Sequence, residues 1–289
     1  MLIRQASSDE FDKYNRVIET AGLHARVEVL RFCFRHPDIR CYVALVDGTV
    51  AGTGCATFYH GGTGWIGYIS VLPEYRRRGI GRALAEYGEE WLLARGARSI
   101  ILLATREGER LYEKIGYVKG IDYIALEGVG PAQDPGGCEI SRATGALATA
   151  TQAGLDLRPA ASGDWARILA LDRCATGELR ENMLSAMTTV KVALRAGTVT
   201  GFHALGPWGT GPIIASDRET GSVLLNRSIG RCPGKRMRVH VPSANEDALS
   251  QLERSGFIES SRSAYMVKGP WPEPYNPQMI WSMFGFSLG

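Results

Sequence analysis

Apolar residues recur along the chain with two periods, and each period predicts one kind of element. Short runs rich in β-branched and aromatic residues predict strands near 2–6, 40–47, 50–60, 64–72, 99–104 and 117–127. Apolar residues at helical spacing predict helices near 8–21, 24–36, 79–95 and 107–115. The stretch 128–154 is rich in Gly, Ala, Thr and Pro with little periodicity, and is predicted to be a linker. The first half of the chain is therefore predicted to be an α/β domain.

The same pattern returns in the second half. Residues 43–52 (VALVDGTVAG) and 192–201 (VALRAGTVTG) each predict a hairpin of two short strands. With a shift of 140 residues, segment 104–118 aligns with 244–258 at a glycine and at the aromatic residue after it. The alignment is faint but keeps its order, so it predicts a second, divergent copy of one fold.

Composition restricts the class of protein. The 289 residues include 33 Lys+Arg and 30 Asp+Glu, a net charge of +3, which is too small to indicate a nucleic-acid-binding protein. Apolar runs fall short of the roughly 18 to 20 residues of a membrane helix, and the polar N-terminus resembles no signal peptide. The apolar end of the chain is expected to pack as a final strand rather than to anchor to a membrane. We expect a cytoplasmic protein, monomeric or homodimeric, that binds neither nucleic acid nor membrane.

The six cysteines are isolated in the sequence. They form no CxxC pair, and no histidine lies at zinc-ligand spacing from them. We therefore expect reduced, mostly buried thiols and no metal site.

Residues 64–95 carry the pattern of an anion site. A predicted strand ends at Pro73, and the basic turn 76–81 (RRRGIG) leads directly into a helix. A helix start offers unpaired N–H groups and a positive dipole end, and glycine lets an anion approach the backbone closely. The turn therefore suits a pyrophosphate, against the alternative of a solvated basic loop. It contains neither the GxxxxGK[ST] nor the GxGxxG motif.

Two segments resemble one known family, the GNAT superfamily of N-acetyltransferases. The first resembles its acetyl-CoA motif and reads Val71-x-Pro73-x-x-Arg76-x-x-Gly79-x-Gly81-x-Ala83-Leu84. The second resembles its later signature and reads Leu111-Tyr112-x-x-x-Gly116-Tyr117. The resemblance covers residues 1–127 well, and 155–268 more weakly.

The resemblance implies a fold and a division of labour. Each half is expected to be a mixed, mostly antiparallel twisted sheet flanked by helices, in the α/β (α+β) class. Residues 1–127 would be the catalytic domain, 128–154 the linker, and 155–289 a degenerate GNAT-like domain with an acceptor-site or structural role.

The resemblance also implies roles for single residues. Backbone groups of the strand would pair with the pantetheine arm, and those of the turn would hold the pyrophosphate. Tyr112 would be the general acid that protonates the departing thiolate. Thr105 stands where many members carry an Asn that contacts the cofactor. The implied cofactor-binding residues are Ile69, Ser70, Val71, Arg76, Arg77, Arg78, Gly79, Ile80, Gly81, Arg82 and Thr105.

One part of the family pattern is missing. The positions that often supply the general base hold Trp65 and Gly67, and neither accepts a proton. Glu74, His60, Tyr68 or an ordered water are the local alternatives. An acyl-carrying Cys41 or Cys55 is a further alternative, without a histidine partner evident in the sequence.

The second copy has lost the pattern. At the shift of 140, Gly79 becomes Glu219 and Tyr112 becomes Leu252, while Asp217 adds a second carboxylate at the predicted helix start. Carboxylates there satisfy the helix dipole themselves and repel a pyrophosphate. We therefore expect one active domain.

The second domain still offers candidate acceptor residues, all polar or aromatic. They would face the cleft between the domains and bind the acceptor, or be surface charges and packing residues of a spacer. They are Asp172, Glu178, Arg180, His203 and Trp208.

The function that follows is acetyl transfer from acetyl-CoA to the amine of a small molecule, by direct attack in a ternary complex. The alternative is a non-catalytic acyl-CoA-binding regulator or sensor. Longer acyl donors and an oxygen acceptor stay open, and the sequence does not indicate the acceptor.

Overall fold

The computed structural model describes residues 1–289 except 24–25, 132–149, 153, 286–287 and 289. The chain divides into two compact units. Unit 1 comprises residues 1–120, 264–271 and 285–289, and unit 2 comprises 121–263 and 272–284. Most of the predicted linker lies outside the described residues, although Ala150–Gln152 within it forms strand β7.

Unit 1 is a mostly antiparallel sheet with the strand order β1-β2-β3-β4-β5-β13. The strands are β1 (Leu2–Gln5), β2 (Ile39–Val46), β3 (Thr49–Tyr59), β4 (Thr63–Val71), β5 (Ser99–Ala104) and the C-terminal part of β13 (Ile258–Lys268). The helices are α1 (Phe11–Thr20), α2 (Val27–Arg35), α3 (Ile80–Ala94) and α4 (Glu109–Lys114). Every strand and helix predicted for this half is present within a few residues of its expected bounds.

Glycines on β3 set how closely helix α3 packs on this sheet. A Cβ atom built on Gly52 would lie 2.9 Å from the Leu84 side chain of α3. A Cβ on Gly54 would lie 2.3 Å from the ring of Tyr42, whose hydroxyl in turn touches Gly88 of α3. The lack of side chains at these two positions of β3 therefore leaves room for a large apolar layer. This layer includes Ile80, Leu84, Leu92 and Tyr112.

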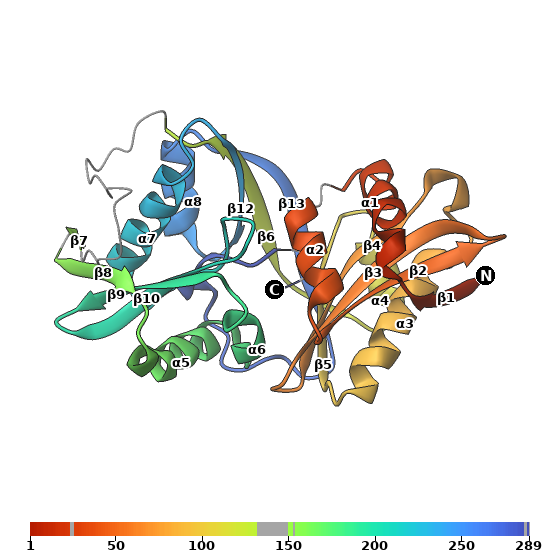
Figure 1. Ribbon diagram of the computed structural model, residues 1–289, viewed down its shortest axis with the longest axis horizontal. Helices are drawn as coiled ribbons and strands as arrows, with labels where there is room; N and C mark the ends of the chain where they lie inside the picture. Colours follow the sequence, from red (N-terminus) through yellow and green to blue (C-terminus); the bar gives the residue numbers. More distant parts are fainter. Residues whose placement is uncertain (24–25, 132–149, 153, 286–287, 289) are drawn as a thin grey trace. The chain divides into compact units, whose positions relative to one another are not determined.

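Unit 2 contains a six-stranded antiparallel sheet in the order β14-β11-β10-β9-β8-β7. Its further strands are β8 (Leu155–Pro159), β9 (Thr189–Arg195), β10 (Thr198–Leu205), β11 (Ile213–Ala215) and β14 (Ile280–Ser282). Strands β6 (Val118–Val129) and β12 (Arg236–Pro242) form a further antiparallel pair. Helices α5 (Trp165–Thr176) and α6 (Glu181–Leu184) lie on one side of β8–β10, and α7 (Arg218–Gly230) and α8 (Glu246–Arg254) on the other (Figure 1). The apolar end of the chain does form a strand, β14, as expected.

The two halves of the sequence exchange their final strands. By sequence β6 belongs to the first copy, yet its residues 123–129 pair with β12 of the second. Its counterpart at the shift of 140 is β13, whose residues 264–268 pair with β5 of the first copy. Each unit is thus completed by a strand from the other half of the chain. Apolar alternation identifies a strand and its buried face, but not the edge that it joins, so the pattern alone could not indicate this exchange.

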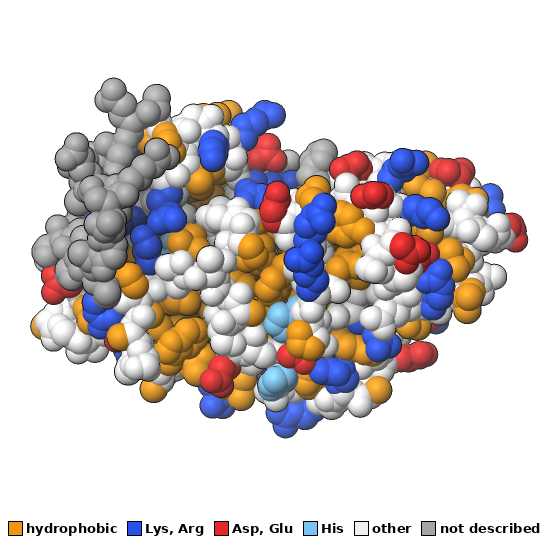
Figure 2. Space-filling model, viewed as in Figure 1, with side chains coloured by type: hydrophobic (Ala, Val, Ile, Leu, Met, Phe, Trp, Pro, Cys, Tyr) orange, Lys and Arg blue, Asp and Glu red, His pale blue; other side chains and the backbone are white. Residues whose placement is uncertain are grey.

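Charged side chains of both signs are interspersed on the face that Figure 2 presents. That distribution agrees with the small net charge of the sequence. Among the helices that the structure describes, each is too short or too polar to cross a bilayer.

Candidate functional site

Strand β4 is paired with β5 along only half of its length. Its parallel pairing with β5 covers Thr63–Ile66, matched with Ser99–Leu102, and the register ends there. A bulge follows, because β4 has one extra residue opposite β3, and Tyr68 takes a left-handed φ of 52°. The parallel ladder with β5 therefore does not extend to residues 69–71, which suits pairing of this segment with an extended ligand.

Ser70 lies on this open segment. Its side chain is buried, and its hydroxyl has no hydrogen-bond partner within the described chain. Ile69 and Val71 on either side are half-buried. Because buried polar groups are almost always paired in folded proteins, this hydroxyl is suited to a ligand that offers it a hydrogen bond.

The turn after β4 leads into helix α3, whose N-terminus has no side-chain cap. Arg77 and Gly79 both have left-handed φ angles, of 65° and 80°. Gly79 is the N-cap residue of α3 and no side chain caps this end, so the first N–H groups of the helix, from Ile80 to Arg82, point outward. A Cβ on Gly79 would meet nothing, and one on Gly81 would come no closer than 3.7 Å to any atom. The left-handed φ explains the glycine at position 79. At position 81 neither backbone conformation nor packing within the described residues requires a glycine, whereas close access of a ligand to the backbone does.

The arginines of the turn divide into two roles. Arg76 donates from Nε to the carbonyl of Val71 at 3.2 Å, and Arg78 donates to the carbonyl of Glu74 at 3.0 Å. Arg82 pairs with Glu86 one helical turn further on, while Arg77 is exposed. The side chains of Arg76 and Arg78 thus stabilise the turn, whose backbone is left to bind an anion.

Tyr112 lies on α4, in the same apolar layer as the start of α3. Its side chain is 8 % exposed, and its ring meets that of Tyr117 edge-on at 5.7 Å. Burial, and then the negative charge of Glu89, raise the pKa of Tyr112 well above its usual range. Tyr112 therefore keeps its proton throughout the physiological range, as a general acid must. Thr105 lies just after β5, with an exposed side chain and a carbonyl that accepts the N–H of Gly108 at 2.8 Å.

The alternative bases and nucleophiles differ in position. His60 pairs with Asp38 beyond the opposite end of β4, and roughly 26 Å of strand separate that end from Val71. Tyr68 lies on the bulge itself and Glu74 in the exposed turn. Burial raises the pKa of Cys41. The neighbouring Cys33 and Cys41 thiols, together with burial, raise that of Cys55, so neither thiolate forms readily.

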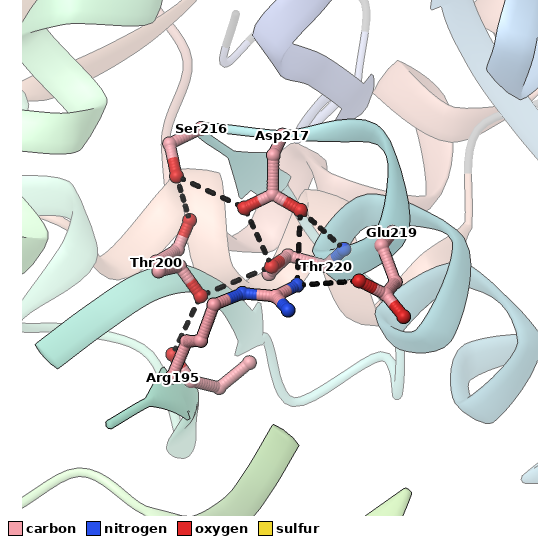
Figure 3. Close-up of polar contacts among 7 residues, drawn as sticks. Arg195, Thr200, Ser216, Asp217, Glu219 and Thr220 are labelled. Atoms are coloured by element: carbon pink, nitrogen blue, oxygen red, sulfur yellow. Dashed lines mark hydrogen bonds and ion pairs between the residues drawn. The ribbon is translucent and has the colours of Figure 1, made fainter. Parts of the chain in front are cut away.

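The corresponding helix of unit 2, α7, has a closed start (Figure 3). Asp217 accepts the backbone N–H of Thr220 at 2.9 Å and its hydroxyl at 2.8 Å. Arg195 reaches across from β9 to Glu219 at 2.7 Å and to Asp217 at 3.5 Å. The prediction that carboxylates satisfy this helix end is therefore confirmed.

The chain's own tail occupies the place next to that helix. Strand β14 pairs with β11, as an extended ligand would pair with the open edge of β4. Asn245, the counterpart of Thr105, donates to the carbonyls of Gln278 and Ile280, both at 2.9 Å. The Trp281 ring packs on Gly221, the counterpart of Gly81, where a Cβ would lie 1.9 Å from the indole. A cavity of about 330 Å³ remains beside this segment, and its lining includes the carboxylates of Asp217, Glu246 and Asp247.

The candidate acceptor residues are all buried in unit 2 rather than exposed. Asp172 and Arg180 form a bidentate ion pair at 2.6 and 3.0 Å, with Glu178 buried nearby in sequence. His203 lies on β10, where burial and then the charges of Arg231 and Lys191 lower its pKa to about 3. Trp208 packs over the Gly206 backbone. The ion pair holds its two side chains against each other, which favours a packing role.

Sequence reasoning missed a buried ion pair in unit 1. Glu89 of α3 is 5 % exposed and accepts a hydrogen bond from Lys268 of β13 at 2.6 Å. The available signal was a carboxylate on the apolar stripe of a helix, between Ala85 and Leu92. Its lysine partner could not be identified, because it lies on the exchanged strand.

Family models match both halves of the chain. The Acetyltransferase (GNAT) family model matches residues 5–117, and an Acetyltransferase (GNAT) domain model matches 168–280. An acetyltransferase of Photorhabdus laumondii is 33% identical over 125 residues, which cover 40% of this chain and 86% of that protein. The chain belongs to the GNAT acetyltransferase family. One from Pectobacterium atrosepticum is 31% identical over 134 residues, covering 44% of this chain and 93% of that protein.

Solved structures share the GNAT fold over the full length. A structure described as an acetyltransferase from Pyrococcus horikoshii has a TM-score of 0.77 at 22% identity, covering 100% of this chain and 95% of that one. A GCN5-related N-acetyltransferase from Sphaerobacter thermophilus has a TM-score of 0.66 at 20% identity, covering 95% and 97%. These structures confirm the expected fold class. The family models and the relatives show that the chain is an N-acetyltransferase with two GNAT domains in tandem, as its motifs predict.

Proposed function

We propose that this GNAT enzyme transfers an acetyl group from acetyl-CoA to the amine of a small molecule, by direct attack in a ternary complex held by unit 1. The observation that carries the proposal is the open edge of β4, which runs directly into the uncapped start of α3. An extended polar arm and a pyrophosphate, joined in that order, match these two features.

Several residues of unit 1 would hold the cofactor. The backbone of Ile69–Val71 would pair with the pantetheine arm, and the orphan hydroxyl of Ser70 would gain a partner there. The N–H groups from Gly79 to Arg82 would bind the pyrophosphate, with Arg77 exposed beside them. Thr105 would contact the cofactor more weakly than an Asn, because a hydroxyl offers fewer hydrogen bonds than an amide.

The chemistry assigned to the chain is proton transfer. Acetyl-CoA supplies a thioester, whose carbonyl carbon the amine nitrogen attacks to form the new C–N bond. As the C–S bond breaks, the Tyr112 hydroxyl donates its proton to the sulfur. The proton lost by the amine passes to Tyr68, Glu74 or an ordered water, since His60 lies beyond the far end of β4.

We assign one acetyl-CoA to each chain. In unit 2 the capped start of α7 and the seated strand β14 leave no equivalent pair of open backbone groups within the described residues. Calorimetric titration with CoA is expected to give one site per chain. A second site of similar affinity would contradict this assignment.

The function is tested by thiol release from acetyl-CoA across a panel of small amines. Amine-dependent release is expected, and Tyr112→Phe is expected to lower kcat roughly 100-fold with little change in the KM for acetyl-CoA. Tyr265→Phe is the matched control, because it removes the same atom from another buried tyrosine of unit 1.

Two results would refute parts of the proposal. If Tyr112→Phe keeps full activity at every pH, Tyr112 is not the acid. If CoA binds tightly but no amine gives turnover, the non-catalytic sensor is the better reading.

A further inference from the structure

A carboxylate is buried beneath the candidate site. Glu89 lies on the apolar face of α3, and its Oε1 atom is buried without a hydrogen-bond partner in the described part of the chain. Its Oε2 atom accepts a hydrogen bond from Lys268 Nζ at 2.6 Å. A buried charge persists only when it is paired, so the position of Lys268 is fixed by Glu89.

Lys268 comes from the second half of the chain. It ends β13 and faces the α3 side of unit 1 together with Ala264 and Met266, which belong to the same apolar layer as Tyr112. Its ammonium lies 5.8 Å from the centroid of the Tyr117 ring, within the range of a cation–π contact. Lys268 thus contacts both Glu89 and Tyr117.

Tyr117 in turn confines Tyr112. The two rings meet edge-on at 5.7 Å, with 71° between their planes, and the Tyr117 N–H donates to the Tyr112 carbonyl at 3.0 Å. On another side, the backbone of Gly108 approaches so closely that a Cβ there would lie 3.2 Å from Tyr112 Cε2. The contacts of the Tyr112 ring with Tyr117 and Gly108 therefore set the direction of its hydroxyl.

We propose that Lys268, anchored on Glu89, is a positioning residue that acts through Tyr117 to aim the hydroxyl of Tyr112. This inference rests on the proposed function, in which Tyr112 is the general acid. An acid must be held within a fraction of an ångström of its target, and here the contacts that hold it include a strand exchanged from the other half of the chain. The second GNAT domain therefore contributes a side chain that supports the catalytic group of the first.

A double-mutant cycle between Lys268 and Tyr112 tests the proposal. Lys268→Met keeps the length of the side chain but removes its charge, and is expected to lower kcat about tenfold with the KM for acetyl-CoA unchanged. Lys268→Arg keeps the charge, the ion pair and the ring contact, and is expected to stay within about twofold of wild type. In the Tyr112→Phe background, Lys268→Met is expected to cause no further loss of kcat, because no hydroxyl is left to aim.

Equal fold-losses in the two backgrounds, or an unchanged kcat in Lys268→Met, would overturn the proposal in favour of a purely structural ion pair. If Lys268→Met does not fold, the same cycle with Glu89→Gln decides, since Lys268 then loses its charged anchor. Failure of the proposed function looks different, because the wild-type enzyme then shows no amine-dependent thiol release at all.

Discussion

Burial decides what individual ionisable side chains do in this protein. Tyr112 keeps its proton because its phenolate would be buried beside the carboxylate of Glu89. His203 stays neutral because its imidazolium would be buried near two other cations. The sequence indicates Tyr112 through a motif, but it contains no signal that His203 and Asp172 are buried, because burial depends on how elements pack. Residue type alone is therefore a poor guide to the roles of His203 and Asp172.

His203 predicts a pH-dependent stability. Its pKa is about 3 in the folded state against about 6.5 when unfolded, so below pH 6.5 the unfolded chain takes up a proton that the folded chain does not. Folding stability therefore falls as the pH decreases from 6.5 towards 3, by about 2 kcal/mol at pH 5 from this group. Urea unfolding of wild type and His203→Phe at pH 7 and pH 5 should show that difference only in the wild type. Equal pH dependence in both proteins would exclude the assignment.

The ion pair of Asp172 and Arg180 predicts a stability effect rather than a kinetic one. Both side chains are at most 3 % exposed, so Asp172→Asn leaves a buried guanidinium without its counter-charge and is expected to cost about 3–5 kcal/mol. Glu259→Gln removes an exposed pair with Arg262 and should change little. An Asp172→Asn enzyme of wild-type stability but altered acceptor KM would instead support acceptor recognition.

At the scale of elements, the equivalent helices α3 and α7 begin in different environments. Helix α3 begins at Gly79 with no side-chain cap, while α7 begins at an Asp217 that caps it. The sequence predicted the uncapped start of α3 and the capped start of α7. Both depend on local residue types, which are arginine and glycine before α3 and two carboxylates at the start of α7. The tail strand β14 beside α7 was only partly predictable, since its partner β11 lies far from it in sequence.

Alanine substitutions at Gly81 of α3 and at its counterpart, Gly221 of α7, should have different effects. In Gly221→Ala, the new Cβ would overlap the Trp281 ring, and displacement of the tail is expected to cost about 1–3 kcal/mol of unfolding free energy. In Gly81→Ala, the Cβ meets ordinary contacts, so stability should hold or rise by up to about 1 kcal/mol. The KM for acetyl-CoA should instead rise roughly tenfold, about 1.4 kcal/mol. Thermal unfolding and steady-state kinetics of both variants check this, and a destabilised Gly81→Ala with unchanged KM would contradict it.

At the scale of the whole molecule, the exchanged strands make the two GNAT domains interdependent. Their number, fold class and order followed from the repeat and from the motifs. The exchange did not follow, because β6 and β13 occupy equivalent positions in the two copies and their patterns suit either edge. The ion pair of Lys268 and Glu89 was hidden for the same reason.

Separated halves should therefore not be independent. A fragment of residues 1–131 lacks the strand that covers β5 and the cation that neutralises Glu89, so it is expected to aggregate or remain unfolded. Co-expression with residues 150–289 should restore a soluble complex with thiol-release activity. A fragment 1–131 that unfolds cooperatively and turns over at the wild-type rate would show that the exchange is dispensable.

Strand exchange also has a consequence during synthesis. Strand β5 is complete at residue 104, but its partner in β13 emerges from the ribosome about 160 residues later. At the usual speed of translation this is roughly 10–30 s, during which the first domain has its GNAT motifs but an open sheet edge. Prematurely terminated chains lack both the last strand of unit 1 and the lysine beneath Tyr117. Activity is therefore expected only from chains translated at least through Lys268.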